Sequence, residues 1–164
     1  MMRIYTIGYE RAAFADFAAT LVEAGVTSVI DVRATPHSRR REFAFKHLGP
    51  ELAAYGIRYE SWPELGTPEA GRAAAKRGDM ADFHRSFMGQ LATPEARAAL
   101  DALMERAAIE RPCLMCYERD PAHCHRSLIG EWLLAEPADL EVVDLRVDTP
   151  SAGSGAGEVD RSGR

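Results

Sequence analysis

Short runs of apolar and β-branched residues recur along the chain and are typical of strands buried in a sheet. The first run, RIYTI, ends before Gly8, and the second, TSVIDVR, is apolar enough to be covered on both faces. Polar or Gly/Pro-containing segments separate many of the runs. The pattern predicts five strands, at residues 3–7, 27–33, 57–62, 112–117 and 140–145.

Between these runs the apolar residues take up the spacing of helices. Phe14, Phe17 and Leu21 recur at helical intervals, and Gly25 fits the position just after a helix. Thr93 is a suitable cap for the helix that follows it. We expect helices in AFADFAATLVEAGV, in GPELAAYG, at 81–90, at 94–108 and in HRSLIGEWLLA, and a loop in PELGTPEAG.

The alternation of strands and helices indicates an α/β fold. We expect a single domain over residues 1–147, built on a mainly parallel sheet of about five strands with helices on both faces. The 164 residues suit one hydrophobic core. Residues 148–164 are rich in Gly and Ser and lack apolar periodicity, so we expect a disordered tail.

Polar residues follow several of the predicted strands at the point where each strand ends. The carboxyl ends of parallel strands meet at one edge of a sheet, where ligands of open α/β sheets bind. We therefore predict a substrate site at this edge. Its expected binding residues are Gly8, Tyr9, Glu10, Asp31, Arg33, Ser38, Arg39, Gly66, Arg126 and Ser127.

Charge is distributed unevenly along the chain. The net charge of -5 argues against a protein that coats nucleic acid by general basicity. Residues 33–47 nevertheless carry five basic side chains against one acidic side chain, a local net charge of +4. This island predicts a small anionic ligand, with nucleic acid as a further partner through Arg39, Arg40 and Arg41. The alternative is a solvated loop without a partner.

The stretch CYERDPAHCHRS, residues 116–127, concentrates the candidate chemistry. Backbone N–H groups at the start of a helix bind anions, and Arg126 and Ser127 would add a guanidinium fork and a hydroxyl. Arg33 would face the same ligand from another strand end. The alternative for each arginine is a structural ion pair with a glutamate: Glu10, Glu64 or Glu118.

Four residues of the same stretch are candidates for catalysis. Glu118 and His125 are the candidate acid/base groups, because a carboxylate near an imidazole and arginines is tuned toward neutral pH or held ionised. Cys124 is an optional nucleophile, since a helix start is a position that lowers the pKa of a thiol. Cys116 is the second candidate thiol. The alternative is that Cys124 only packs beneath the loop.

The spacing of the cysteines and histidines argues against a metal site. Cys113 and Cys116 are three residues apart in a predicted strand, so their side chains should point to opposite faces. Four ligands are available in Cys116, His123, Cys124 and His125, but the adjacent Cys124 and His125 would both have to bend toward one ion. We expect no structural zinc and no other cofactor, and we expect Cys113 to be a small buried side chain.

Nothing in the sequence points to an oxidising compartment. The three cysteines are interpreted as reduced thiols. The opening MMRIYTIGYE lacks the charged and apolar regions of an export signal, and no apolar run is long enough to span a membrane. We expect a cytoplasmic protein without a membrane partner.

Four stretches of the chain together resemble one family. TIGYE, VIDVRATPHSR, YGIRYESWPELG and LMCYERDPAHCHRSLIGEWL are similar, in this order, to the family known as domain of unknown function 488, whose relatives include the YeaO-like proteins. The resemblance covers residues 3–144 and implies a single α/β domain with a site, but no reaction. The motif positions that it implies are Thr6, Gly8, Glu10, Asp31, Arg33, Pro36, Ser38, Leu65, Gly66, Cys116, Glu118, Cys124, His125 and Arg126.

The leading hypothesis is an enzyme that acts on a small anionic or phosphate-bearing substrate, such as a nucleotide or a nucleic-acid end. Arg33 and Arg126 would hold the anion, and the acid/base groups and thiols of residues 116–127 would perform the chemistry. The main alternative is a non-catalytic module that binds a nucleotide or nucleic acid. A metal-binding structural protein is the third hypothesis. The sequence leaves the reaction class and the oligomeric state open.

Overall fold

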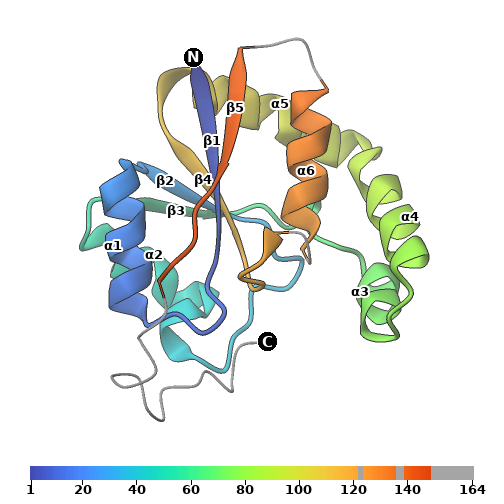
Figure 1. Ribbon diagram of the computed structural model, residues 1–164, viewed down its shortest axis with the longest axis horizontal. Coiled ribbons are helices and arrows are strands. Elements are labelled where there is room, and N and C mark those ends of the chain that lie inside the picture. Colours follow the sequence, from blue (N-terminus) through green and yellow to red (C-terminus); the bar gives the residue numbers. More distant parts are fainter. Residues whose placement is uncertain (122–123, 136–138, 149–164) are drawn as a thin grey trace.

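The computed structural model describes residues 1–121, 124–135 and 139–148. Five parallel strands form one sheet in the order β3-β2-β4-β1-β5 (Figure 1). They are β1 (Met2–Gly8), β2 (Ser28–Asp31), β3 (Arg58–Ser61), β4 (Pro112–Cys116) and β5 (Leu140–Asp144). The sheet confirms the predicted α/β fold, and each strand lies within a few residues of its expected place. Most of the expected tail, residues 149–164, lies outside the described residues.

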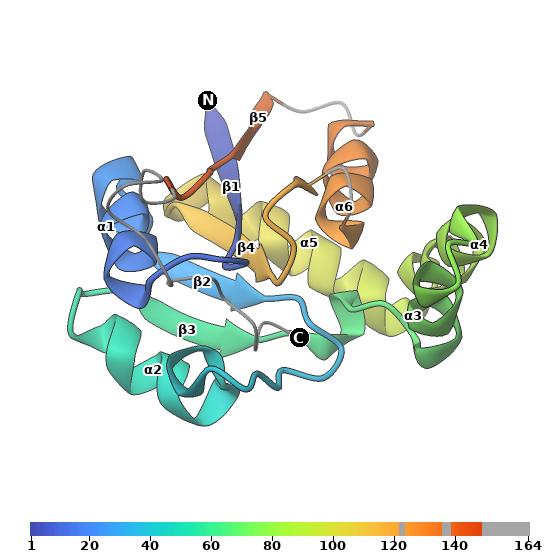
Figure 2. The ribbon, with the colours of Figure 1, turned by 60° about the horizontal axis from the view of Figure 1, so that its bottom comes forward.

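Helices cover both faces of the sheet (Figure 2). On one face lie α1 (Phe14–Ala24) and α2 (Phe45–Ala53), and on the other lie α5 (Pro94–Ile109) and α6 (His125–Leu134). The two faces have separate apolar cores, because successive side chains of a strand point to opposite sides. Cys113 belongs to the core beneath α1, whereas Cys116 belongs to the core beneath α6. This opposition confirms the prediction for the two cysteines.

Two further helices, α3 (Glu69–Lys76) and α4 (Met80–Leu91), extend beyond the sheet (Figure 2). They pack against each other, and α4 places Phe87 in the same core as α5 and α6. The expectation of a loop in PELGTPEAG is wrong for its last residues, where α3 begins. This helix buries only Gly71 and Ala74, so it lacks the large apolar residues by which a helix is recognised in a sequence.

Sequence signals at two helix ends are confirmed. Gly25 ends α1 in the left-handed conformation, with φ of 78°. Thr93 caps α5, its side chain accepting the backbone N–H of Ala96 at 3.2 Å. The α2 helix begins before the expected GPELAAYG. Two short 3-10 turns, η1 (Arg41–Phe43) and η2 (Pro63–Leu65), are also present. Within the described ranges, no helix has both the length and the apolar character needed to cross a membrane.

Candidate active site

Two glycines allow loops to approach the carboxyl ends of the strands closely. Gly8 ends β1, and a Cβ at this position would lie 1.7 Å from the carbonyl oxygen of Glu118. Gly66 follows η2, and a Cβ there would lie 2.4 Å from the backbone nitrogen of Ala34. Neither position has room for a side chain, so these glycines let loops pack against the strand ends. Substrate binding by Gly8 and Gly66 stays a prediction.

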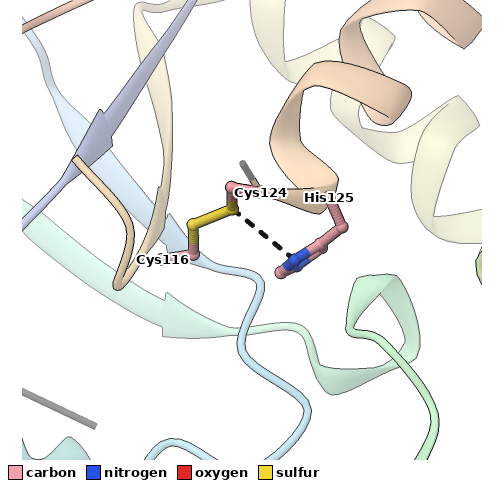
Figure 3. A group of neighbouring side chains, drawn as sticks. All are labelled: Cys116, Cys124 and His125. Carbon is pink, nitrogen blue, oxygen red and sulfur yellow. Dashed lines mark hydrogen bonds between the residues drawn. A yellow bond between two sulfur atoms is a disulfide. The ribbon is translucent and has the colours of Figure 1, made fainter. Parts of the chain in front are cut away.

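Cys116 and Cys124 are joined by a disulfide at the carboxyl edge of the sheet (Figure 3). Cys116 is the last residue of β4, and Cys124 is the N-cap of α6, so the chain between them returns to the same edge. The expectation of reduced thiols is therefore wrong for this pair, because the fold brings together two cysteines that are 8 positions apart. Cys113 is a free thiol buried on the opposite face, and burial raises its pKa.

Arg126 lies completely buried beside the disulfide. Its side chain donates hydrogen bonds from Nε to Cys116 Sγ at 3.1 Å, from Nη1 to Thr6 Oγ1 at 3.0 Å and from Nη2 to the Glu118 carbonyl at 2.5 Å. Thr6 in turn donates to Asp144. Burial lowers the pKa of Arg126, but the ordinary pKa of a guanidinium is so high that the group stays charged at neutral pH.

His125 is the first residue of α6 and is also buried. Its Nε2 lies 2.8 Å from the Val32 carbonyl oxygen, so Nε2 carries a proton and donates it to this acceptor. Burial lowers the pKa of His125 to about 4, and the ring is neutral at physiological pH. The lone pair of Nδ1 is then available 3.6 Å from Cys124 Sγ (Figure 3). The backbone N–H of Arg126 donates to the same sulfur at 3.5 Å.

Arg33 follows β2 and lies buried in a second polar cluster. Its Nε and Nη2 donate to the two carboxylate oxygens of Asp31 at 2.9 and 2.7 Å, and Nη1 donates to the Tyr9 hydroxyl at 3.2 Å. Tyr59 also donates to Asp31, at 2.6 Å. Burial alone would lower the pKa of Arg33, but the hydrogen bonds and charge of Asp31 outweigh burial and raise it. Arg33 therefore forms a structural ion pair, with Asp31 in place of the glutamates considered.

The structure brings many of the candidate residues together in two groups along one sheet edge. At the end of β4 and the start of α6 lie Cys116, Glu118, Cys124, His125 and Arg126. At the end of β2 lie Tyr9, Asp31 and Arg33. The contact between His125 and the Val32 carbonyl links the two groups. Both arginines use their donors within the protein, so the anion cradle stays a prediction that these contacts do not support.

The remaining predicted binding residues take part in local contacts. Glu10 accepts the backbone N–H of Arg119 at 3.0 Å. Ser38 accepts a backbone N–H at 3.1 Å, and the Ser127 hydroxyl donates to the Cys124 carbonyl at 3.0 Å. Arg39 is exposed on the loop before η1. A ligand role for these residues stays a prediction.

Thr6, Val32 and Asp144 hold the two central side chains of the site, those of Arg126 and His125. Residue chemistry alone does not single out these three residues. Thr6 has one signal, because it is a polar residue in an apolar strand and lies on the same face as Ile4. It is also one of the family motif positions. Val32 acts through its backbone carbonyl and Asp144 lies on an exposed strand end, so neither carries a recognisable signal.

The chain belongs to the family described as Domain of unknown function DUF488, whose model matches residues 13–133. This match confirms the family resemblance and covers three of the four sequence stretches, whereas TIGYE precedes it. The matched range includes both cysteines of the disulfide and Arg126, whereas Thr6 and Gly8 precede it. No curated protein and no solved structure matches the chain at a significant level. The family description names no activity, so the function has to be argued from the geometry of the site.

Proposed function

We propose that the protein is a thiol–disulfide oxidoreductase in which Cys116 and Cys124 alternate between a dithiol and a disulfide. The observation that carries the proposal is the bond between these cysteines at the start of α6, beside the buried Arg126. The proposal keeps the thiols expected from the sequence and gives His125 a positioning role beside Cys124. It does not require an anion held between two arginines.

Cys124 is the better candidate for the attacking thiol. Its exposed fraction is 4%, against 1% for Cys116. It caps α6, where the helix dipole and the backbone N–H of Arg126 stabilise a thiolate. The Nδ1 of His125, 3.6 Å away, is placed to accept a hydrogen bond from the Cys124 thiol, and the Val32 carbonyl holds the ring in the tautomer that this bond needs.

The exchange proceeds in two steps. The Cys124 thiolate attacks one sulfur of a substrate disulfide, which forms a mixed disulfide and releases the first substrate thiol. Cys116 then gives its proton to the Glu118 carboxylate, 3.7 Å from its sulfur, and, assisted by the Nε of Arg126, attacks the Cys124 sulfur. The Cys116–Cys124 bond forms and the second substrate thiol leaves. The substrate thus gains two electrons and two protons from the protein dithiol.

The burial of both sulfurs restricts the substrate class. Cys116 and Cys124 are almost fully covered, so a large folded protein would not reach them without movement of the surrounding loops. Small-molecule disulfides and short cysteine-containing peptides fit this access better. Reduction of the resulting protein disulfide would require a thiol or dithiol of the same size class.

Differential alkylation followed by peptide mass analysis tests the proposal. After oxidation by a small disulfide, Cys116 and Cys124 should be linked and only Cys113 should react with the alkylating reagent in denaturant. After treatment with a dithiol, all three cysteines should react, and the change should be reversible. Cys113→Ala, on the opposite face of the sheet, is the control and should retain the cycle. Stable mixed disulfides at Cys116 or Cys124, in place of the internal link, would contradict the proposal.

A further inference from the structure

Three buried donor atoms converge at the disulfide. Cys116 Sγ, Cys124 Sγ and His125 Nδ1 lie within 4.8 Å of one another (Figure 3). Thiolate sulfur and imidazole nitrogen are ligands that Zn²⁺ prefers in proteins. We infer that the reduced protein binds Zn²⁺ through these three residues. The inference goes beyond the redox proposal, because metal binding requires two thiols but no redox cycle.

The spacing of the donors suits a tetrahedral ion. Zn–S bonds of about 2.3 Å and Zn–N bonds of about 2.0–2.1 Å place a sulfur and a nitrogen ligand about 3.6 Å apart. Cys124 Sγ and His125 Nδ1 are separated by 3.6 Å. Two sulfur ligands would lie about 3.8 Å apart, a separation that becomes available once the disulfide is reduced. The Cα atoms of Cys116 and Cys124 are 7.6 Å apart, which leaves the side chains room to separate.

The backbone at the start of α6 explains how two adjacent residues face one ion. Cys124 is the N-cap and is extended, with φ of -138° and ψ of 151°, whereas His125 is already helical. This change of conformation turns the sulfur and the ring nitrogen toward each other (Figure 3). The bend that Cys124 and His125 would need in order to face one ion is therefore provided by the backbone. His123, the other ligand considered from the sequence, lies outside the described residues.

The groups around the donors resemble those that surround metal ligands in proteins. His125 donates its other ring N–H to the Val32 carbonyl, which fixes the ring and leaves Nδ1 for the ion. Each sulfur already accepts an N–H from Arg126: Cys116 from Nε at 3.1 Å and Cys124 from the backbone at 3.5 Å. Hydrogen bonds from such donors, especially a charged one, strengthen when the acceptor becomes a thiolate.

The charges at the site are compatible with an ion. Binding of Zn²⁺ releases two thiol protons, and the two thiolates then offset the charge of the metal. The buried site thus takes up the ion without gaining net charge, which would be costly in an apolar interior. Arg126 gains an anionic acceptor in Cys116 while keeping Thr6 and the Glu118 carbonyl.

Three protein ligands leave one position of a tetrahedral ion open, which is the arrangement of catalytic zinc sites. The Glu118 carboxylate lies 3.7 Å from Cys116 Sγ, so an acid/base group stands beside the ion. A water molecule or a small ligand would occupy the open position.

Titration of the full-length chain with Co²⁺ tests the inference, because Co²⁺ occupies zinc sites and its absorption reports thiolate ligands. Protein reduced with a phosphine should bind one Co²⁺ per chain with sulfur-to-cobalt and tetrahedral bands, and added Zn²⁺ should remove them. The disulfide form of the same chain should bind none, which makes it an internal control for folding. Cys113→Ala should bind as the unaltered chain does, whereas Cys116→Ser and Cys124→Ser should lose the bands.

Two results would overturn the inference. One is a reduced, folded chain that shows no tetrahedral Co²⁺ spectrum. The other is equal metal uptake by the reduced and the disulfide forms. The experiments also distinguish failure of the zinc inference from failure of the redox proposal. If the reduced chain binds Co²⁺ but the disulfide never re-forms, only the redox proposal fails, and if the disulfide cycles without metal uptake, only the zinc inference fails.

Discussion

Arg126 brings a permanent positive charge into a buried site, where each of its donors needs an acceptor. A sulfur, a hydroxyl and a backbone carbonyl provide those acceptors, the hydroxyl on β1 and the other two at the end of β4 and in the loop directly after it. The guanidinium could not turn toward solvent without breaking several of these bonds. This residue is therefore better suited to holding Cys116 and the strand ends in place than to capturing a free ligand.

Replacing Arg126 by Met should lower the free energy of unfolding by about 2–4 kcal/mol, because buried acceptors lose their donor. Those acceptors are Thr6 Oγ1 and the Glu118 carbonyl. Urea unfolding of the disulfide form measures the loss. Arg39→Met, at an exposed position, is the control and should change the free energy by no more than about 0.5 kcal/mol. Equal effects of the two variants would mean that the contacts of Arg126 contribute little to stability.

At the scale of elements, the strands and the helix ends could largely be predicted from the sequence. Apolar runs identify the five strands, and Gly25 and Thr93 mark helix ends because each has a local geometric role. The α3 helix could not be predicted in this way, because its buried residues are small and it is covered by α4. Close backbone contacts, such as that between β1 and the segment after β4, are also invisible in the sequence.

This close contact gives a prediction for Gly8. Gly8→Ala should lower the free energy of unfolding by about 3–5 kcal/mol or prevent folding, because the added Cβ would overlap the Glu118 carbonyl. Gly49→Ala is the matched control, since it lies in α2 with nothing within 4 Å of the new Cβ. It should stabilise the protein by up to about 1 kcal/mol. Thermal unfolding compares the two, and a Gly8→Ala chain as stable as the unaltered one would contradict the tight packing of this segment.

An ion pair between β3 and α5 makes the stability of the protein depend on pH. Arg106 donates to both carboxylate oxygens of Glu60, at 2.6 and 3.1 Å, and these hydrogen bonds lower the pKa of Glu60. Because the folded pKa is depressed, the stabilisation is present above the unfolded pKa and is lost as pH falls through the folded pKa. Glu60 is partly exposed, so we expect at most about 1 kcal/mol.

Urea unfolding from neutral to acidic pH measures this contribution. The difference in stability between the unaltered chain and Glu60→Gln should shrink as the solution becomes acidic. Arg106→Gln should remove the same component together with its contact to Glu110, and the double variant should remove no more than Arg106→Gln alone. A difference that grows toward acidic pH would have the wrong sign for this ion pair.

At the scale of the whole molecule, the parallel sheet determines where the site lies. The order of strands and helices is sufficient to predict that residues 116–127 and the end of β2 share one edge. The contacts at that edge could not be predicted, because they depend on the path of the chain after β4 and on the side-chain directions at the cap of α6. The sequence is equally compatible with an Arg126 that faces a ligand and with the buried Arg126 that the structure shows.

The redox equilibrium of the Cys116–Cys124 pair tests the central proposal most directly. The chain would be equilibrated in a series of dithiol and disulfide buffers, quenched, and its disulfide fraction measured by alkylation. We predict one reversible two-electron transition, with a slope of about 30 mV for each tenfold change in the ratio of the two forms. The transition should persist in Cys113→Ala and vanish in Cys124→Ser. A chain that keeps Cys116 and Cys124 reduced in every buffer, or that forms only mixed disulfides, would contradict the proposal.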